Sequence, residues 1–291
     1  MSPHEVHLED RLTRLSLAPS VGGSLVNWQV KKTGQPLLRH SDAAALASGS
    51  PRRLGCYPLA PWSNRIAEGG FERPDGWLAL PPNTDNSPYA IHGSAWQQPW
   101  RVSHQGSDHA CLTLESRLPF AYRATLHVSL DEGCLSLDLQ VTHLDLRPTW
   151  HGLGLHPYFP RHDDTQLLAP ARQVWLGEAD TLPSRQEEIP EDWRFETLSA
   201  LPQRVVDHAF SGWQGACTIV QPSAGYQLQC SASGTDHYLL FCPQDQGFFC
   251  FEPVSHPINA HHLPGRPGLR LLSQGEHVSL GFRMAYQPLS R

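Results

Sequence analysis

The chain has few cationic side chains, and they do not cluster. Its 291 residues include 22 Lys and Arg against 28 Asp and Glu, which gives a formal net charge of −6. The longest basic runs are the pairs Lys31-Lys32 and Arg52-Arg53. Proteins that bind nucleic-acid backbones present Lys and Arg in patches or stripes. The sequence therefore predicts no nucleic-acid partner.

Long apolar runs are missing as well. No segment approaches the ~18 consecutive apolar residues that a membrane-spanning helix requires. The first residues, MSPHEVHLEDRLTRL, lack the charged-then-apolar arrangement of a secretory signal. We therefore expect a cytoplasmic protein with no membrane partner.

Cysteine pairs at metal-binding or redox spacing are also lacking. The seven cysteines are odd in number and scattered, and no C-x-x-C occurs. This pattern indicates neither a disulfide framework nor a zinc knuckle. We expect most of the thiols to be reduced and to pack as small apolar groups.

Helical periodicity is scarce. One short helix is expected within Ser41–Ser48 (SDAAALAS), opened by a Ser or Asp cap. The charged, proline-broken stretch Pro183–Glu196 is expected to form a long surface loop. No repeat of fixed period and no domain boundary is evident in the sequence.

Short alternating segments are what the chain has in abundance. Segments with apolar residues at every second position, rich in β-branched and aromatic residues, are Cys111–Leu118, Ala124–Leu130, Leu135–Leu144, Tyr226–Ala232, Tyr238–Cys242 and His277–Arg283. This alternation indicates half-buried strands, and close spacing with Pro and Gly between them favours a sandwich or barrel. The sequence predicts an all-β fold, a large antiparallel β-sandwich, as one domain over residues 1–291.

Four stretches place a polar or charged residue among aromatics, prolines and glycines. They are Pro61–Phe71 (PWSNRIAEGGF), Ala90–Trp96 (AIHGSAW), Gly154–Phe159 (GLHPYF) and Phe248–Ala260 (FFCFEPVSHPINA). Such mixtures suit loops and strand ends at the mouth of a site. A cleft with many Trp side chains and scattered polar groups is also suited to carbohydrate, because sugar faces stack on rings while hydroxyls need donors and acceptors.

In this order and spacing the four stretches resemble the aldose 1-epimerase (galactose mutarotase) family. The matching signals are Asn-Arg-Ile, His-Gly, His-x-Tyr-Phe and Glu-Pro in series, with Leu15–Val30 similar to the family's first hairpin and Asp207–Trp213 to a later loop. The resemblance covers residues 11 to 286. It implies a β-supersandwich fold and interconversion of the α and β anomers of a free aldose.

The resemblance implies that His156 is the general acid and Glu252 the general base. Mutarotation needs an acid at the ring oxygen and a base at the anomeric hydroxyl, and imidazole and carboxylate have suitable pKa values. From the residues alone, His156 could equally be a core histidine and Glu252 a structural ion-pair partner. No metal and no organic cofactor is expected, because this pair suffices for the chemistry.

The resemblance also implies a substrate-binding set. Arg65 and His92 match sugar-orienting residues, and Asp207 matches an acceptor of sugar hydroxyls; Asn64 and Tyr158 complete the set. The alternatives are a surface salt bridge for Arg65, a turn residue for His92 and an Asx-turn for Asp207. The rings of Tyr158, Trp62 and Trp96 could be stacking platforms or part of the core.

Some features depart from the family pattern. Ser stands where the family has Gly in His-Gly-Gly and where it has Thr after the Glu-Pro motif, and the family's Leu-Pro-Thr-Gly turn appears as Leu182 to Arg185 (LPSR). A glutamine that contacts sugar in some members has only Gln244 and Gln246 as candidates. These differences concern substrate contacts more than the acid–base pair.

Seventeen histidines raise the question of a metal site. The best groupings are His162-Asp163-Asp164 and His256 with His261-His262, and neither has a zinc-site spacing. His104, His109 and His127 are expected on the surface.

Two functions follow from these patterns. The first is an aldose 1-epimerase-like isomerase with a small-molecule sugar as its substrate, as a monomer or homodimer. The alternative is a non-catalytic sugar-binding or sensing protein on the same fold, which would need Arg65, His92 and the aromatics but not a facing His156 and Glu252. A phosphorylated-sugar epimerase, a variant of the first, would need further Lys or Arg at the pocket.

Overall fold

The protein is built around two large antiparallel sheets. The computed structural model describes residues 5–85, 87–177 and 182–289. Every pairing between named strands in these ranges is antiparallel. The prediction of an antiparallel all-β fold is confirmed.

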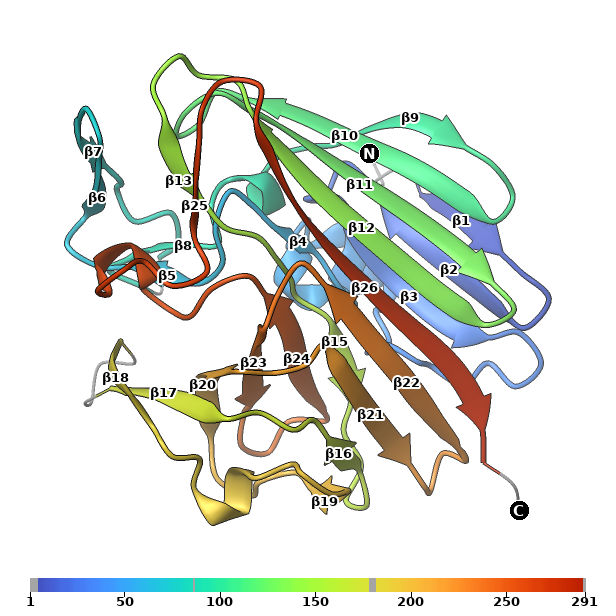
Figure 1. The fold of residues 1–291 in the computed structure, drawn as a ribbon. Helices are drawn as coiled ribbons and strands as arrows, with labels where there is room; N and C mark the ends of the chain where they lie inside the picture. The colour runs from blue at the N-terminus through green and yellow to red at the C-terminus, as the bar shows by residue number, and fades with distance from the viewer. Residues whose placement is uncertain (1–4, 86, 178–181, 290–291) are drawn as a thin grey trace.

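The larger sheet has nine strands and runs diagonally through the molecule (Figure 1). In spatial order its strands are β19 (Ser199–Ala200), β16 (Gln166–Leu168), β21 (Ala216–Gln221), β22 (Tyr226–Ser233), β26 (His277–Pro288), β12 (Cys134–His143), β11 (Tyr122–Asp131), β10 (His109–Ser116) and β9 (Arg101–Gln105). It joins strands from both halves of the chain.

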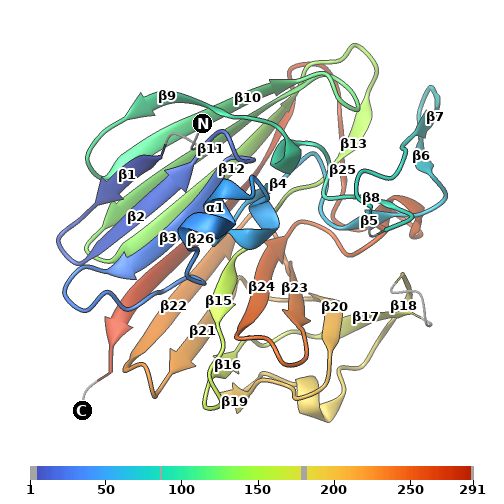
Figure 2. The same ribbon diagram turned by 180° about the vertical axis from the view of Figure 1, so that it is seen from behind.

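The second sheet has eight strands, and three of the candidate site residues, Tyr158, Asp207 and Glu252, lie in them. In spatial order its strands are β18 (Pro183–Glu187), β17 (Gln173–Gly177), β20 (Val206–Ser211), β23 (His237–Cys242), β24 (Phe248–Val254), β14 (Gly154–Leu155) and β4 (Pro58–Leu59), with β15 (Tyr158–Pro160) also paired to β24. Seen from behind, β15, β23 and β24 lie in front of β21 and β22, and β1, β2 and β3 lie in front of the other half of the nine-stranded sheet (Figure 2).

Smaller elements surround the two sheets. They are the sheet of β1 (Val6–Glu9), β2 (Thr13–Ala18) and β3 (Ser24–Val30), the pairs β5 (Arg65–Ile66) with β8 (Ala90–Ile91), β6 (Gly70–Arg73) with β7 (Gly76–Ala79) and β13 (Thr149–His151) with β25 (Arg270–Leu272), the helix α1 (Ala43–Ala47), and the 3₁₀ turns η1 (Pro51–Arg53), η2 (Ala95–Gln97), η3 (Glu191–Trp193) and η4 (Ala260–His262). The five-residue α1 is too short to cross a bilayer, and no other helix in the described ranges is long and apolar enough to do so.

The core lies between the layers and follows from the alternation in the sequence. In β11, alternate side chains from Tyr122 to Leu130 are buried while their neighbours face outward. Side chains from the nine-stranded sheet, such as Leu126 and Phe282, share one apolar cluster with Leu15 of β2 and Phe251 of β24. Burial of this surface is the main favourable contribution to folding.

Most predicted elements are found in the structure. All six alternating segments overlap strands, and the first hairpin is β2 with β3. The short helix is α1, and its cap is Asp42, whose side chain accepts a hydrogen bond from the Ala45 N–H. All seven cysteines are free, and five of them are buried. His104, His109 and His127 are exposed, as expected.

The prediction of a continuous loop over Pro183–Glu196 is wrong. Pro183–Glu187 forms β18, which pairs with β17 in a register that sets Arg185 opposite Leu176. The strand lies at the edge of its sheet, where polar side chains face solvent. Its pairing with β17 therefore outweighs a composition that lacks strand-forming residues.

Acid should weaken the fold, because histidines are buried in neutral form. Burial lowers the pKa of His151 to about 3 and that of His256 to about 4. The unfolded chain, with histidine pKa values near 6.5, binds more protons below that pH, so stability is lost as pH falls below 6.5 toward the folded-state pKa values. Each of these two histidines should lower the free energy of unfolding by about 2 kcal/mol at pH 5.

The contribution of His151 can be isolated by urea unfolding at pH 7 and pH 5. The His151→Gln variant should lose about 2 kcal/mol less than the unaltered chain over this interval, whereas the exposed-site control His127→Gln should match it. Identical losses in His151→Gln and the unaltered chain would contradict the assignment.

Candidate active site

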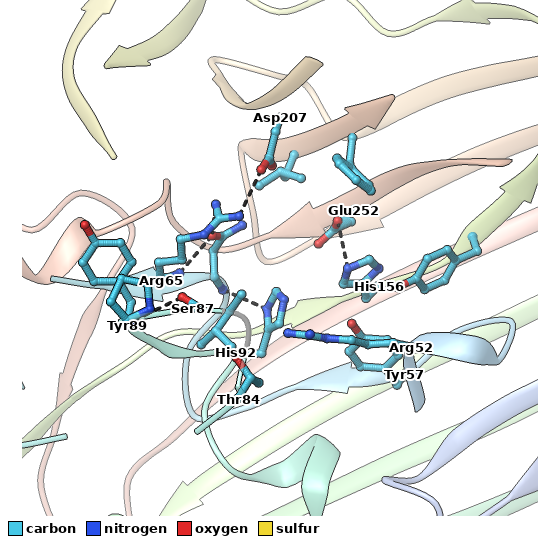
Figure 3. A pocket seen from close by; sticks show the side chains of 16 residues that line it. Arg52, Tyr57, Arg65, Thr84, Ser87, Tyr89, His92, His156, Asp207 and Glu252 are labelled. Carbon is cyan, nitrogen blue, oxygen red and sulfur yellow. Dashed lines mark hydrogen bonds and ion pairs between the residues drawn. The ribbon is translucent and has the colours of Figure 1, made fainter. Parts of the chain in front are cut away.

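A pocket opens where the eight-stranded sheet meets β5 and the loops that follow β4, β7 and β8. Its volume is about 540 Å³, within the range of small-molecule sites (Figure 3). The residues that line it are Arg52, Tyr57, Asn64, Arg65, Thr84, Ser87, Pro88, Tyr89, Ile91, His92, His156, Tyr158, Asp207, Leu239, Phe241 and Glu252. Polar groups therefore converge in it from segments far apart in the sequence.

His156 and Glu252 meet at the back of this pocket. Nε2 of His156 lies 3.3 Å from Oε1 of Glu252. The strand register explains the contact: β14 and β15 both pair with β24, with Gly154 opposite Val254 and Tyr158 opposite Cys250. His156 lies midway between these two pairings, so the same register brings it beside Glu252.

The pair has unmet hydrogen-bonding capacity. His156 is 7% exposed and Glu252 1% exposed. Among the residues that the structure describes, Nδ1 of His156 and Oε2 of Glu252 find no hydrogen-bond partner. Buried polar atoms are rarely left without a partner, because each such atom costs about 1–3 kcal/mol. Such atoms at a pocket wall are suited to a polar ligand.

Burial favours the uncharged forms of both groups. The pKa of Glu252 is raised well above its usual value by burial and then by the nearby Asp207, while Arg65 opposes the shift. The pKa of His156 is lowered to about 3 by burial and then by the charges of Arg39 and Arg52. Both shifts act against a separate carboxylate and imidazolium, so the form that burial favours is a protonated Glu252 beside a neutral His156.

Aromatic rings fix the orientation of the His156 imidazole. Its ring lies 4.7 Å from the ring of Tyr57, at 27°, and 4.7 Å from that of Tyr158, at 15°. The Arg39 guanidinium covers Tyr158 at 3.7 Å. The backbone N–H of His156 also donates to the Tyr57 carbonyl, at 3.0 Å. Tyr158, predicted as a substrate-binding residue, thus both lines the pocket and packs on the imidazole.

Arg65 and Asp207 form an ion pair on the Glu252 side of the pocket. Nη2 of Arg65 lies 3.2 Å from Oδ2 of Asp207, and Nη1 donates to Oδ1 of Asn64, also at 3.2 Å. Both partners of the ion pair are about one-fifth exposed and line the pocket, so Arg65 is not in a surface salt bridge. Asp207 lies within β20, opposite Phe241 in β23, so it does not form an Asx-turn.

His92 is held as a neutral donor. Its Nδ1 accepts a hydrogen bond from the backbone N–H of Asn64, at 3.0 Å, so Nε2 carries the proton. Burial, followed by the charges of His156, Arg52 and Arg65, lowers the pKa of His92 well below its usual value.

The turn after His92 requires glycine. Gly93 has a φ of +64°, and a Cβ at this position would lie 2.1 Å from the Ala60 carbonyl oxygen. Asn64 and His92 also adopt left-handed backbone conformations, at φ 58° and 62°. Such conformations in non-glycine residues cluster at functional sites.

Two aromatic candidates do not reach the pocket. Trp62 is a core residue that packs on Phe71 and His261. Trp96 stacks behind Tyr57 at 5.7 Å and lines an adjoining cavity instead. The Trp62 ring is therefore buried by the core rather than offered to a ligand.

The glutamine and metal candidates lie elsewhere. Gln244 and Gln246 line a separate polar cavity with His162 and Asp163. His256 uses both ring nitrogens, since Nε2 accepts from the Ser63 N–H and Nδ1 donates to the Pro257 carbonyl. Within the described ranges, the group of three or more potential ligands that comes together is His156, Cys250 and Glu252, with ligand atoms within 4.8 Å of one another.

The structure adds residues that the motifs did not indicate. Arg52 enters the pocket from η1, Tyr57 precedes β4, and Leu239 and Phe241 come from β23. Thr84, Ser87 and Tyr89 supply polar groups from the loop between β7 and β8. The Arg52-Arg53 pair was visible in the sequence, but nothing there placed it near His156.

Comparisons with known proteins agree with this architecture. The sequence profile described as aldose 1-epimerase matches residues 5–285. The uncharacterized protein YphB of Escherichia coli K12 is 31% identical over 254 residues, which cover 84% of this chain and 86% of that protein. The solved structure of a candidate aldose 1-epimerase from E. coli K12 has a TM-score of 0.91 at 28% identity, covering 98% of this chain and 99% of the other.

The fold extends to more distant proteins. The structure of a GalM/aldose epimerase homologue from C. elegans has a TM-score of 0.81 at 14% identity, over 99% of both chains. At that identity the match shows the shared fold.

The protonation state of the pair can be observed by NMR without any activity assay. With ¹⁵N-labelled histidine, the His156 ring signals, assigned by their loss in His156→Asn, should show the neutral form from pH 8 down to pH 5. In urea-unfolded protein the same ring should titrate near pH 6.5. Titration of folded His156 near 6.5 would mean that burial does not control its charge.

Proposed function

The chain belongs to the aldose 1-epimerase family, and we propose on that basis that it interconverts the α and β anomers of a free aldose. The proposal rests above all on the buried contact of 3.3 Å between His156 Nε2 and Glu252 Oε1 at the back of the pocket. The ring oxygen and the anomeric hydroxyl oxygen are both bonded to C1, so an acid and a base for them must lie close together.

Ring opening moves two protons. A proton passes from Glu252 to His156, and His156 then donates it to the ring oxygen as the C1–O bond to that oxygen breaks. Glu252 takes the proton of the anomeric hydroxyl, which leaves an aldehyde at C1. The open sugar then faces a protonated Glu252 and a neutral His156, the form that burial favours. Rotation about C1–C2 and the reverse transfers give the other anomer.

Arg65, His92 and Asp207 would orient the sugar. Arg65 offers N–H donors that remain beside its bond to Asp207, and Nε2–H of His92 is a neutral donor. Asp207 is an acceptor for hydroxyls, and Asn64 holds both Arg65 and His92 by hydrogen bonds. Charge on Arg65 also favours the ionised form of Glu252 that takes the anomeric proton.

Removing either member of the pair tests the mechanism. Glu252→Gln keeps the shape but cannot accept a proton, and His156→Asn removes the donor to the ring oxygen. Each should lower kcat for anomer exchange by at least ~10²-fold, with a smaller effect on sugar binding. Exchange NMR over a panel of aldoses measures the rate, and calorimetry measures binding.

Two variants of the same chemical type serve as controls. Glu72→Gln and His127→Asn alter exposed residues outside the pocket and should exchange anomers at the unaltered rate. Near-normal exchange by folded Glu252→Gln would exclude the mechanism. Tight sugar binding by the unaltered chain without exchange of any aldose would favour the non-catalytic sugar-binding function instead.

A further inference from the structure

Arg52 brings a positive charge to the pocket that no carboxylate balances among the residues that the structure describes. Its guanidinium lies 5.0 Å from the ring of Trp96 and reaches toward His92 (Figure 3). It lines both the main pocket and an adjoining cavity of about 460 Å³. Asp85 lines that cavity too, but it is exposed and forms no ion pair with Arg52 in the described structure.

The charges of the pocket are divided between two sides. On the Glu252 side, Arg65 is neutralised by Asp207 at 3.2 Å. On the His156 side, Arg52 in the pocket and Arg39 behind it form no ion pair with an acid among the described residues. Arg39 donates to the backbone carbonyls of Arg52 and Leu54, both at 2.7 Å. A half-buried cation without a partner is costly, and a neutral sugar would not compensate it.

The same two arginines work against the proposed acid. Their charges add to burial in lowering the pKa of His156 to about 3. An anion bound at Arg52 would oppose this effect and make transfer of a proton to His156 less costly. The positive charge on this side is therefore better suited to a substrate that brings its own negative charge.

We propose that the substrate is an aldohexose with an oxyanion at C6, held by the Arg52 guanidinium over Trp96. This rests on the proposed function, which places the ring oxygen at His156. C6 is attached to C5, the other neighbour of the ring oxygen, so a C6 substituent projects on the His156 side, where Arg52 lies. Arginine offers a planar fork of donors that matches phosphate, sulfonate or carboxylate oxygens.

The test compares neutral and anionic forms of the same sugar. Anomer exchange above the spontaneous rate is measured by NMR for glucose and galactose, for their 6-phosphates, for the 6-deoxy-6-sulfonates and for the uronates. In at least one anionic series kcat/KM should exceed that of the neutral sugar by ~10-fold or more. The best series identifies the oxyanion as phosphate, sulfonate or carboxylate.

Variants then assign the preference to Arg52. Arg52→Met should lower the ratio of anionic to neutral kcat/KM by at least ~10-fold, and Arg52→Lys, which keeps charge but not the fork, should lower it less. The matched control is Arg53→Met, which removes the same charge from the neighbouring exposed position outside the pocket and should leave the ratio unchanged. A ratio at or below one in every series, or a ratio unaffected by Arg52→Met, would overturn the proposal.

The same sugars distinguish a failure of the proposed epimerase function from a failure of the proposal on Arg52. If the unaltered chain exchanges no sugar in the panel, calorimetry with the same anionic sugars decides the matter. Binding that is tighter than for the neutral sugar and lost in Arg52→Met would uphold recognition by Arg52 in a protein that is not an epimerase. Equal binding by the unaltered chain and Arg52→Met, or no binding, would overturn it.

Discussion

The contact between His156 and Glu252, 3.3 Å apart and almost without solvent access, is the interaction on which the rest of the site depends. Water would allow the carboxylate and the imidazole to be charged independently, whereas burial makes each charge costly. The result is a pair that shares one proton and can move it over a short distance. Packing of Tyr57 and Tyr158 against the imidazole keeps the donor and acceptor aligned.

The sheet supplies the precision that such a pair needs. Glu252 sits in β24, which is bonded on one side to β23 and on the other to β14 and β15, so its backbone cannot shift without breaking two ladders. The groups proposed to orient the sugar include some from less regular backbone, where Asn64 and His92 adopt left-handed conformations. A rigid strand thus carries the proposed base, and a turn held by hydrogen bonds carries donors proposed for the sugar hydroxyls.

Apolar residues at alternate positions predicted strands such as β11 and β12, and in the structure the burial of these strands alternates residue by residue. The sequence also indicated four segments of the pocket, because polar residues among aromatics and glycines are conspicuous in a β-rich chain, and the family resemblance added the segment with Asp207. It did not indicate Arg52 or Tyr57, since their position depends on how the segment between β3 and β4 folds back over the sheet. The same holds for β18, whose polar sequence pairs only because β17 offers a free edge, and for Trp62 and Trp96, whose rings join the core.

The proposed charge of the substrate and the proton of the pair are linked through the arginines, because the charges of Arg39 and Arg52 add to burial in lowering the pKa of His156.

The central claim, that the buried pair acts as a single one-proton unit, is tested most directly by the pH dependence of kcat/KM for a neutral aldose, which has no ionising group of its own in this range. Since kcat/KM reports the free enzyme, the account predicts a flat profile from pH 5 to 8. A decline centred near pH 6.5, where an ordinary histidine changes charge, would contradict it.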